Sequence, residues 1–381
     1  MAPTRNINDP PPGPNYDSTG IEHYDIPKFT FSNTTVLPNI RVAYRQFPPT
    51  SGSSKGYVLI PTCFSGVINS TFTFTPSSTP ECTALSEYHV IVAAMLSNGE
   101  SASPCNTPFF PEAGELHYED CINAQYHLLT DGLGIKQLEA VIGFSMGGQQ
   151  AYHWAVMYPT FVKRIVGICT SARTSGHNYA FLEGPITALT NSLDYIAYTE
   201  VKQKRARGED VGAHLLEVKP KRGLRAFARA YAAWLTSGPW FREKNWQKIA
   251  GCKSVEEWLQ QREGAYEAIG WDADDLLGLA RMWQMADIGK TVRKEETTLG
   301  GGLGNDEELE AALKSIQAKV LLMPCRTDQY FAVEDNESEA RFLKDGRVEV
   351  IESTWGHIAG GGANAEDVKF MDAKIAEFLK D

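Results

Sequence analysis

The residues Ala140-Val141-Ile142-Gly143-Phe144-Ser145-Met146-Gly147-Gly148-Gln149-Gln150-Ala151 decide the fold. An apolar, partly β-branched run ends at Gly143, and a helical pattern begins after Ser145 and stops at Tyr158-Pro159. The stretch predicts a strand, a sharp turn with one serine at its apex, and a helix. Glycines on both sides of the serine allow strand and helix to approach, and the free N–H groups at the helix start can face an oxyanion.

Two other interpretations of this turn are a glycine-rich connection with an N-capping serine and a phosphate-binding loop. Neither Gly-x-Gly-x-x-Gly nor Gly-x-x-x-x-Gly-Lys-Ser/Thr occurs in the stretch, which weakens the nucleotide alternative. The five-residue pattern Gly-x-Ser-x-Gly carries little information by itself. The apolar strand before it and the helix after it favour the interpretation of Ser145 as a nucleophile.

Length, charge and cysteine content narrow the class of protein. The chain has 381 residues, enough for one large α/β domain with an insertion or for two small domains. The formal net charge of −11 disfavours nucleic acid and anionic membrane surfaces as partners. The polar, proline-rich start predicts no signal peptide, and no run of 18 apolar residues predicts a membrane span. Seven cysteines without a Cys-x-x-Cys pair are typical of free thiols, so we expect a cytoplasmic protein.

One local cluster of positive charge departs from the acidic average. A solvated helix face is the simple interpretation, and an anion-binding patch, for instance for a CoA phosphate, is the alternative. The cluster consists of Lys202, Lys204, Arg205, Arg207, Lys219, Lys221, Arg222 and Arg225.

Apolar strands that alternate with helices predict a doubly wound, mostly parallel sheet that begins with an antiparallel pair. We expect a flexible arm over residues 1–20, a core over 21–174 and 316–381, and a helical cap inserted over 175–315. The predicted strands are Lys28–Phe31, Val36–Tyr44, Tyr57–Ile60, His89–Met95, Leu138–Ile142, Arg164–Cys169, Ala318–Met323 and Arg347–Ile351, and the predicted core helices are Glu119–Thr130, the helix after Ser145 and Ala365–Leu379.

The predicted cap is rich in aromatic residues and contains no convincing strand. Six of the eight tryptophans of the chain lie in it, and it ends in the glycine-rich loop 300–304. Most of these aromatics are expected to pack helix against helix. Their concentration also permits an apolar pocket wall, which we assign to Trp234, Trp240 and Trp283 together with Tyr330.

A serine hydroxyl becomes a good nucleophile only when a base takes its proton and an acid fixes the tautomer of that base. In an open α/β sheet the site lies at the carboxyl ends of the strands, in chain order serine, acid, histidine. Asp328 and His357 each follow a late predicted strand and fit this order. The other histidines precede the elbow or lie in helices and in the insertion. Glu334 and Asp335 compete with Asp328, but they fall in the first turn of the next helix.

An oxyanion hole needs two backbone N–H donors. Met146 directly follows the serine, and the second donor comes from the loop after an early strand. We assign Phe64 to that role, with Cys63 as the next candidate. Cys63 has no general base placed for it, so we interpret it as a structural thiol.

These motifs resemble the homoserine O-acetyltransferase branch of the α/β-hydrolase fold. The resemblance implies a Ser-His-Asp ping-pong mechanism, an acyl-serine intermediate, a helical cap that often dimerises, and no cofactor. It covers about residues 38–170 and 318–378. The matching motifs are Asn98 to Pro104, Phe110-Pro111, Tyr118-Glu119-Asp120, Ala124-Gln125, Leu128-Leu129, Leu133-Gly134-Ile135, Ala140 to Ala151, Asp328 to Phe331, and Gly356-His357.

Two departures from the family pattern bear on the acyl acceptor. Transferases of the family carry an acidic residue directly after the histidine, and this acidic residue holds the ammonium of the acceptor. This chain has Ile358 at that position. The transferases also present a cap arginine to the acceptor carboxylate, which the comparable segment Trp234-Leu235-Thr236-Ser237 lacks, although Arg225, Arg229 and Arg242 lie close by. An unpaired ammonium beside an aliphatic side chain costs several kcal/mol, so homoserine is a poor acceptor.

The sequence therefore predicts an α/β-hydrolase that hydrolyses a small, apolar or specialised-metabolite carboxylic ester without metal or cofactor. One alternative is an O-acyltransferase that moves an acyl group from acyl-CoA to a hydroxylated small molecule. Others are a triad-derived cyclase or lyase and a non-catalytic binding protein. A homodimer through the cap is expected, with no nucleic-acid or membrane partner. The predicted pocket residues are Cys63, Trp234, Trp240, Trp283, Tyr330 and Ile358.

Overall fold

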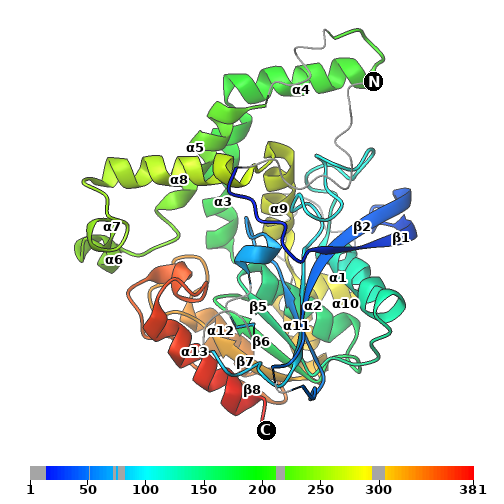
Figure 1. Cartoon of the computed structure of the whole chain (residues 1–381), viewed down its shortest axis with the longest axis vertical. Coiled ribbons are helices and arrows are strands. Elements are labelled where there is room, and N and C mark those ends of the chain that lie inside the picture. The colour runs from blue at the N-terminus through cyan, green and yellow to red at the C-terminus, as the bar shows by residue number, and fades with distance from the viewer. Residues whose placement is uncertain (1–13, 51, 72–73, 76–81, 212–218, 294–304) are drawn as a thin grey trace.

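An eight-stranded sheet lies at the centre of the computed structural model, which describes residues 14–50, 52–71, 74–75, 82–211, 219–293 and 305–381 (Figure 1). The strand order is β1-β2-β4-β3-β5-β6-β7-β8. β1 pairs antiparallel with β2 and β2 antiparallel with β4, whereas all other neighbours are parallel. The predicted doubly wound, mostly parallel sheet is thus confirmed. The strands are β1 (Glu22–Thr30), β2 (Val36–Phe47), β3 (Tyr57–Pro61), β4 (His89–Ala93), β5 (Ala140–Phe144), β6 (Arg164–Ile168), β7 (Lys319–Met323) and β8 (Gly346–Val348).

The central strands are apolar throughout because both faces of the sheet are buried. In β3 the side chain of Leu59 packs on one face, and Val58 and Ile60 pack on the other. Helices α1, α2 and α12 cover the first face, and α13 covers the second. These four helices are α1 (Tyr118–His127), α2 (Met146–Met157), α12 (Val333–Ala340) and α13 (Ala365–Phe378).

Between β6 and β7 the chain leaves the sheet and forms further helices. The helices α3 to α9 gather at one end of the sheet, with α4 farthest from it, and we call them the cap (Figure 1). No helix of the described ranges is long and apolar enough to cross a membrane. The helices of this segment are α3 (Gly176–Thr190), α4 (Leu193–Ala206), α5 (Lys221–Ala232), α6 (Gly238–Arg242), α7 (Asn245–Lys248), α8 (Val255–Ile269), α9 (Ala273–Met285), α10 (Ile288–Arg293) and α11 (Asp306–Ser315).

The helices α10 and α11 return to the core, although the sequence grouped them with the cap over 175–315. Thr291 of α10 donates from Oγ1 to Glu119 Oε1 of α1 at 2.7 Å, and the Ile288 N–H donates to the Ala172 carbonyl at 3.2 Å. The amphipathic pattern of a helix states that one face is buried but not what covers it. The predicted glycine-rich loop 300–304 lies outside the described residues.

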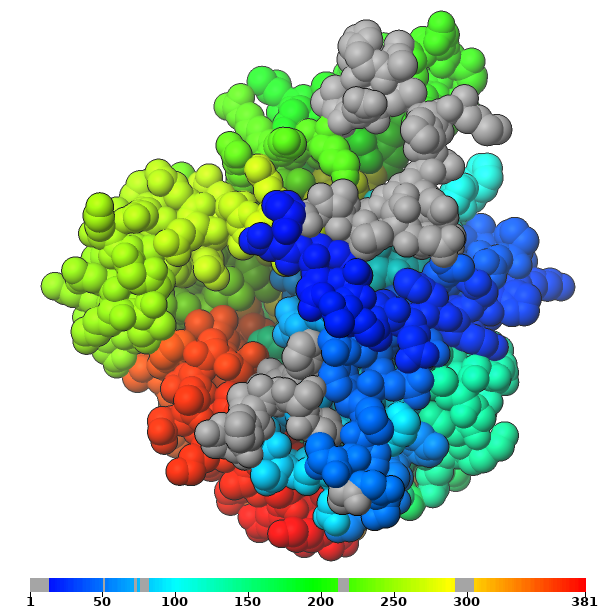
Figure 2. All heavy atoms as spheres, viewed as in Figure 1, coloured from blue at the N-terminus to red at the C-terminus, as the bar shows by residue number. Residues whose placement is uncertain are grey.

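The first described residues join the cap to the core. The Asn15 N–H donates to the Ala268 carbonyl at the end of α8 at 2.9 Å, and the Tyr16 hydroxyl donates to Glu100 at 2.9 Å. Figure 2 shows the blue start of the chain lying across the boundary between cap and core. Residues 14–20 of the predicted arm therefore lie against the molecular surface, and the rest of that arm is outside the described residues.

The turn between β5 and α2 is sterically tight. A Cβ on Gly143 would lie 2.0 Å from the Gly147 carbonyl oxygen, far inside van der Waals contact. Ser145 at the apex has φ 56° and ψ −125°, a backbone conformation that costs about 1–3 kcal/mol for a residue with a side chain. The strand and the helix therefore hold the serine in place only while residue 143 lacks a side chain.

The substitution Gly143→Ala is expected to destabilise the protein by on the order of 4 kcal/mol or more, because the new methyl group meets backbone rather than a mobile side chain. Urea unfolding followed by circular dichroism measures the change. Gly264→Ala in α8 is the matched control: its Cβ would meet nothing within 4 Å, so a gain of about 0.5–1 kcal/mol is expected. Equal stability of the two variants would contradict the steric argument.

Candidate active site

Ser145 is fixed by its own backbone hydrogen bonds. Its N–H donates to the Ile168 carbonyl at 2.9 Å, which ties the turn to β6. Its carbonyl accepts from the Gly148 N–H at 2.9 Å and from Thr170 Oγ1 at 2.8 Å. The residue is only 2% exposed. The hydroxyl therefore sits on a rigid, water-poor support at the start of α2.

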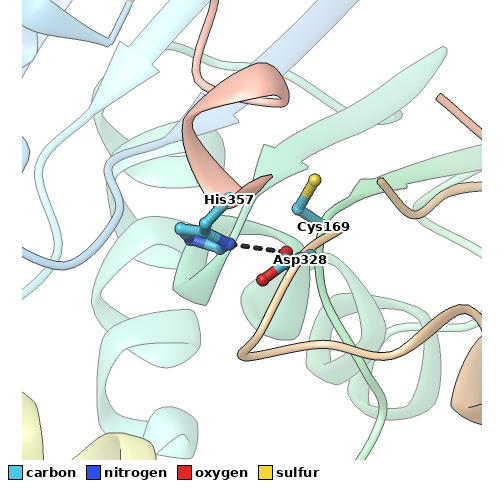
Figure 3. Close-up of side chains that lie close together, drawn as sticks. All are labelled: Cys169, Asp328 and His357. Carbon is cyan, nitrogen blue, oxygen red and sulfur yellow. Dashed lines mark hydrogen bonds and ion pairs between the residues drawn. The ribbon is translucent and has the colours of Figure 1, made fainter. Parts of the chain in front are cut away.

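His357 and Asp328 form a buried hydrogen-bonded pair (Figure 3). The Nδ1 atom of His357 lies 2.7 Å from Asp328 Oδ2, and the two side chains are 3% and 0% exposed. The other carboxylate oxygen accepts from the backbone N–H of Tyr330 at 2.8 Å and of Phe331 at 3.4 Å. A carboxylate held in this way keeps the proton on Nδ1 and leaves Nε2 free to accept one.

The imidazole packs directly against the residue that precedes the serine. The ring centroids of His357 and Phe144 lie 4.6 Å apart. A Cβ on Gly360, three residues after the histidine, would come within 3.1 Å of the Phe144 ring. The structure thus brings the sequence-predicted histidine and acid to the elbow that carries Ser145.

The short cap segment Leu235-Thr236 forms hydrogen bonds with the two loops that carry Asp328 and His357. The Thr236 carbonyl accepts from Gln329 Nε2 at 2.8 Å, and the Leu235 carbonyl accepts from the Ile358 N–H at 3.1 Å. Gly356 has φ +68°, and a Cβ there would lie 2.6 Å from the Thr236 carbonyl. The cap segment therefore fixes the loops that carry the acid and the histidine.

The loop after β3 lies beside the start of α2. Gln150 Nε2 donates to the Thr62 carbonyl at 2.9 Å, and the Gly66 N–H closes a turn on the Cys63 carbonyl at 3.0 Å. In the described part of the chain, no acceptor is found for the N–H of Phe64 in this turn or for that of Met146. Within the described residues these two predicted donors are therefore not used by the fold itself.

Aromatic rings surround the pair. Tyr330 meets His357 edge to face at 4.6 Å between centroids, and burial raises the pKa of its hydroxyl well above 10. Trp283 lies 5.4 Å from Tyr330 and 5.7 Å from Phe64. Two of the predicted pocket residues, Trp283 and Tyr330, are thus at the site. The sequence did not assign the other rings of this cluster to the pocket. Phe144 and Phe331 lie within the quoted motifs but were given no role, and Phe181 and Tyr231 carry no motif.

The remaining predicted pocket residues lie at different distances from the pair. Trp234 contacts Phe181 at 4.6 Å, and Phe181 contacts Tyr330 at 4.8 Å, so Trp234 is one side chain removed. Ile358 is half-buried directly after the histidine. Trp240 belongs to a separate apolar cluster with Trp258, Cys252 and Ala232. Composition alone does not separate a tryptophan that lines a site from one that packs two cap helices.

Two cysteines near the site are neutral thiols. Burial raises the pKa of Cys63 to about 12, and burial and the Asp328 carboxylate raise the pKa of Cys169 well above its usual range. Cys169, Asp328 and His357 offer ligand atoms that all lie within 4.8 Å of one another (Figure 3). A metal would need Cys169 as a thiolate, whereas its raised pKa keeps it a thiol. His357 and Asp328 already form a hydrogen bond with each other. The three residues therefore fit an acid–base pair beside a neutral thiol better than a metal site.

A buried carboxylate supports the elbow from below. Glu339 accepts from the Tyr152 hydroxyl at 2.7 Å, from the Ala172 N–H at 2.7 Å and from Asn336 Nδ2 at 3.1 Å. Asn336 Nδ2 also donates at 2.8 Å to the carbonyl of Thr170, and the hydroxyl of Thr170 in turn donates to the Ser145 carbonyl. Burial raises the pKa of Glu339 to about 7. No motif marks this residue, so the sequence missed it.

Comparison with known proteins places these observations in a family. A family model for the alpha/beta hydrolase fold matches residues 58–360. An ethyl acetate hydrolase from Pseudomonas veronii is 32% identical over 297 residues, 77% of each chain. The structure of an acetylester hydrolase from Corynebacterium glutamicum superposes with a TM-score of 0.75 at 25% identity and covers 95% of this chain and 96% of that one. A homoserine O-acetyltransferase from Pasteurella multocida is 26% identical over 280 residues, 71% of this chain and 69% of its own. The predicted resemblance is confirmed.

The raised pKa of Glu339 has a consequence for stability. Between pH 4.5 and 7 the folded protein holds a proton there that the unfolded chain releases, so this contribution is present at low pH and is lost as the pH rises. Relative to Glu339→Gln, which stays neutral, the wild type should lose roughly 3 kcal/mol across this window. Urea unfolding at several pH values measures the difference.

The matched control for this prediction is Glu337→Gln, an exposed residue of the same helix. Its difference from the wild type should not change across the window. A difference between wild type and Glu339→Gln that stays constant with pH would contradict the assignment.

Proposed function

Because the chain belongs to the α/β-hydrolase fold family, we propose that it is a serine carboxylic-ester hydrolase that works through an acyl-enzyme. The observation that carries this proposal is the buried hydrogen bond of 2.7 Å between His357 and Asp328, packed on Phe144 beside the strained Ser145. The relatives named as ethyl acetate hydrolase and acetylester hydrolase support the same reaction class.

In the proposed mechanism Ser145 Oγ attacks the ester carbonyl while His357 Nε2 takes its proton. The tetrahedral oxyanion accepts hydrogen bonds from the N–H groups of Met146 and Phe64. As the C–O bond breaks, the imidazolium returns the proton to the leaving alcohol and the acyl group stays on the serine. Water then attacks the acyl-serine by the same route and releases the acid. Asp328 stabilises the imidazolium in both halves.

The chemistry of the surrounding rings supports a small, apolar acyl group. Trp283 contacts Tyr330 and Phe331, and these two rings contact the imidazole, with centroid separations of 4.6 to 5.7 Å. These rings present an apolar surface to an acyl group on Ser145 and would shield the acyl-enzyme from bulk water.

A second candidate function is O-acyl transfer, which the similarity to homoserine acyltransferases favours. Two features weigh against an amino-acid acceptor and an acyl-CoA donor. Ile358 supplies no charge for an ammonium, and four cations of the basic cluster are engaged by carboxylates rather than free for phosphate, namely Lys202, Arg207, Lys219 and Arg225.

Replacing the proposed nucleophile tests the reaction class. Ser145→Ala should lower the turnover of ethyl acetate or a p-nitrophenyl acetate by roughly four to six orders of magnitude, because the residues of a triad act as a unit. The exposed Ser338→Ala is the control and should retain full activity. A fluorophosphonate should label the wild type at Ser145 only. Activity that survives Ser145→Ala, or a wild type that the probe does not label, would contradict the proposal.

The side chain after the histidine tests the acceptor. With an acetate ester as donor and L-homoserine present, the wild type should release free acetate and form little O-acetylhomoserine. Ile358→Asp should increase the transferred fraction at least severalfold, because the new carboxylate pairs the ammonium. Ile358→Ala opens the same space without adding a charge, so it should not increase the transferred fraction. Chromatography of the products measures the partition, and efficient transfer by the wild type would favour the acyltransferase instead.

A further inference from the structure

A pocket of about 160 Å³ lies between α5, α8 and the loop after β3. This volume is well below the roughly 300–1,000 Å³ of a site for a whole drug-sized ligand, so it suits one arm of a small ester. Helices α5 and α8 lie side by side in the cap (Figure 1). The lining residues include no acid and are Ser65, Ala228, Tyr231, Leu235, Arg262, Ala265, Tyr266, Ile269 and Trp271.

The walls of this pocket are neighbours of the proposed reaction centre. Ser65 directly follows the proposed oxyanion donor Phe64. The ring of Tyr231 lies 5.3 Å from Phe64 and 5.7 Å from Tyr330, whose own ring lies 4.6 Å from His357. Two aromatic rings in series, Tyr231 and Tyr330, therefore join the pocket to the imidazole.

Arg262 is the one cation in this lining. It lies on the face of α8 that also carries Ala265, Tyr266 and Ile269, at the i, i+3, i+4 and i+7 spacing of a single helix face. Its Nε is buried and has no hydrogen-bond partner in the described residues. Its guanidinium lies 5.9 Å from the centroid of Trp258, and no carboxylate of the described ranges forms an ion pair with it.

The carboxylates of the same helix are engaged elsewhere. Glu256 and Glu263 both pair with Arg229 of α5, and Glu267 pairs with Arg225 of α5. The remaining acid near the helix start, Glu257, accepts from the Lys253 N–H at 2.6 Å. The ion pairs that join α5 to α8 thus leave a positive charge facing the pocket.

We infer that Arg262 binds a carboxylate at the far end of the substrate, so that the enzyme prefers esters that carry an anionic group. This inference rests on the proposed function, which supplies the reacting ester bond. A guanidinium binds a carboxylate through two parallel hydrogen bonds. The apolar remainder of the lining packs the chain between the two ends.

Two pairs of matched esters test this inference and tell on which side of the ester bond the anion lies. Monomethyl succinate against dimethyl succinate places the charge on the acyl side, and O-acetylglycolate against its methyl ester places it on the alcohol side. In the wild type, kcat/KM should favour the anionic member of at least one pair. Arg262→Gln should lower kcat/KM of that member by about tenfold to a hundredfold and change the neutral member less than threefold. Arg262→Lys should restore part of the loss.

Arg205→Gln is the matched control, since it removes an exposed arginine of α4 outside the pocket and should leave both ratios unchanged. A binding readout independent of turnover uses Ser145→Ala and isothermal titration with the preferred anionic ester, whose affinity should fall when Arg262→Gln is added. Equal loss for anionic and neutral esters, or a wild type that favours the neutral member of both pairs, would overturn the inference. Absence of hydrolysis of every ester would instead count against the proposed function, and the titration would then judge Arg262 alone.

Discussion

The close approach of β5 and α2 is the constraint on which the rest of the structure depends. A side chain at Gly143 would collide with the backbone of Gly147, and Ser145 adopts a positive φ because the chain must reverse within so few atoms. The cost of about 1–3 kcal/mol at the serine is borne by the packing of the flanking strands and the hydrogen bonds to Ile168 and Thr170. A turn held by so many contacts cannot relax during a reaction, so the position of the proposed nucleophile is set by the fold itself.

The cap and the core share the machinery that surrounds this serine. The carbonyls of Leu235 and Thr236 accept from the loops that carry His357 and Asp328, and Gly356 lets the two backbones touch. A freely hinged lid would have to break these bonds each time it opened. The cap is therefore better described as a fixed wall beside the proposed triad than as a freely hinged lid.

The sequence predicted the parts of the site that obey chain-order and turn rules, and it missed the parts that depend on packing. Local patterns predict the strand–turn–helix around Ser145 and the succession of eight strands along the chain. They also place Asp328 and His357 after late strands. The return of α10 to the core and the separation of Trp240 from the other rings depend on which surface each apolar face meets. The role of Glu339 could not be predicted for the same reason, because a buried carboxylate is identified only by the hydrogen-bond donors that surround it in the fold.

The chain is similar both to esterases and to homoserine acyltransferases, and the charges around the site bear on the difference between these two reactions. Hydrolysis and transfer share the acyl-serine and differ only in the nucleophile that attacks it. Water needs no binding group, whereas an amino-acid alcohol brings an ammonium that costs several kcal/mol to bury without a partner. Ile358 offers none, and the lining around Arg262 contains no acid, so the described surroundings offer a cation and no anion to the far end of a ligand. Under the proposed function, such charges would disfavour a zwitterionic alcohol as acceptor, in keeping with the proposal that water attacks the acyl-serine.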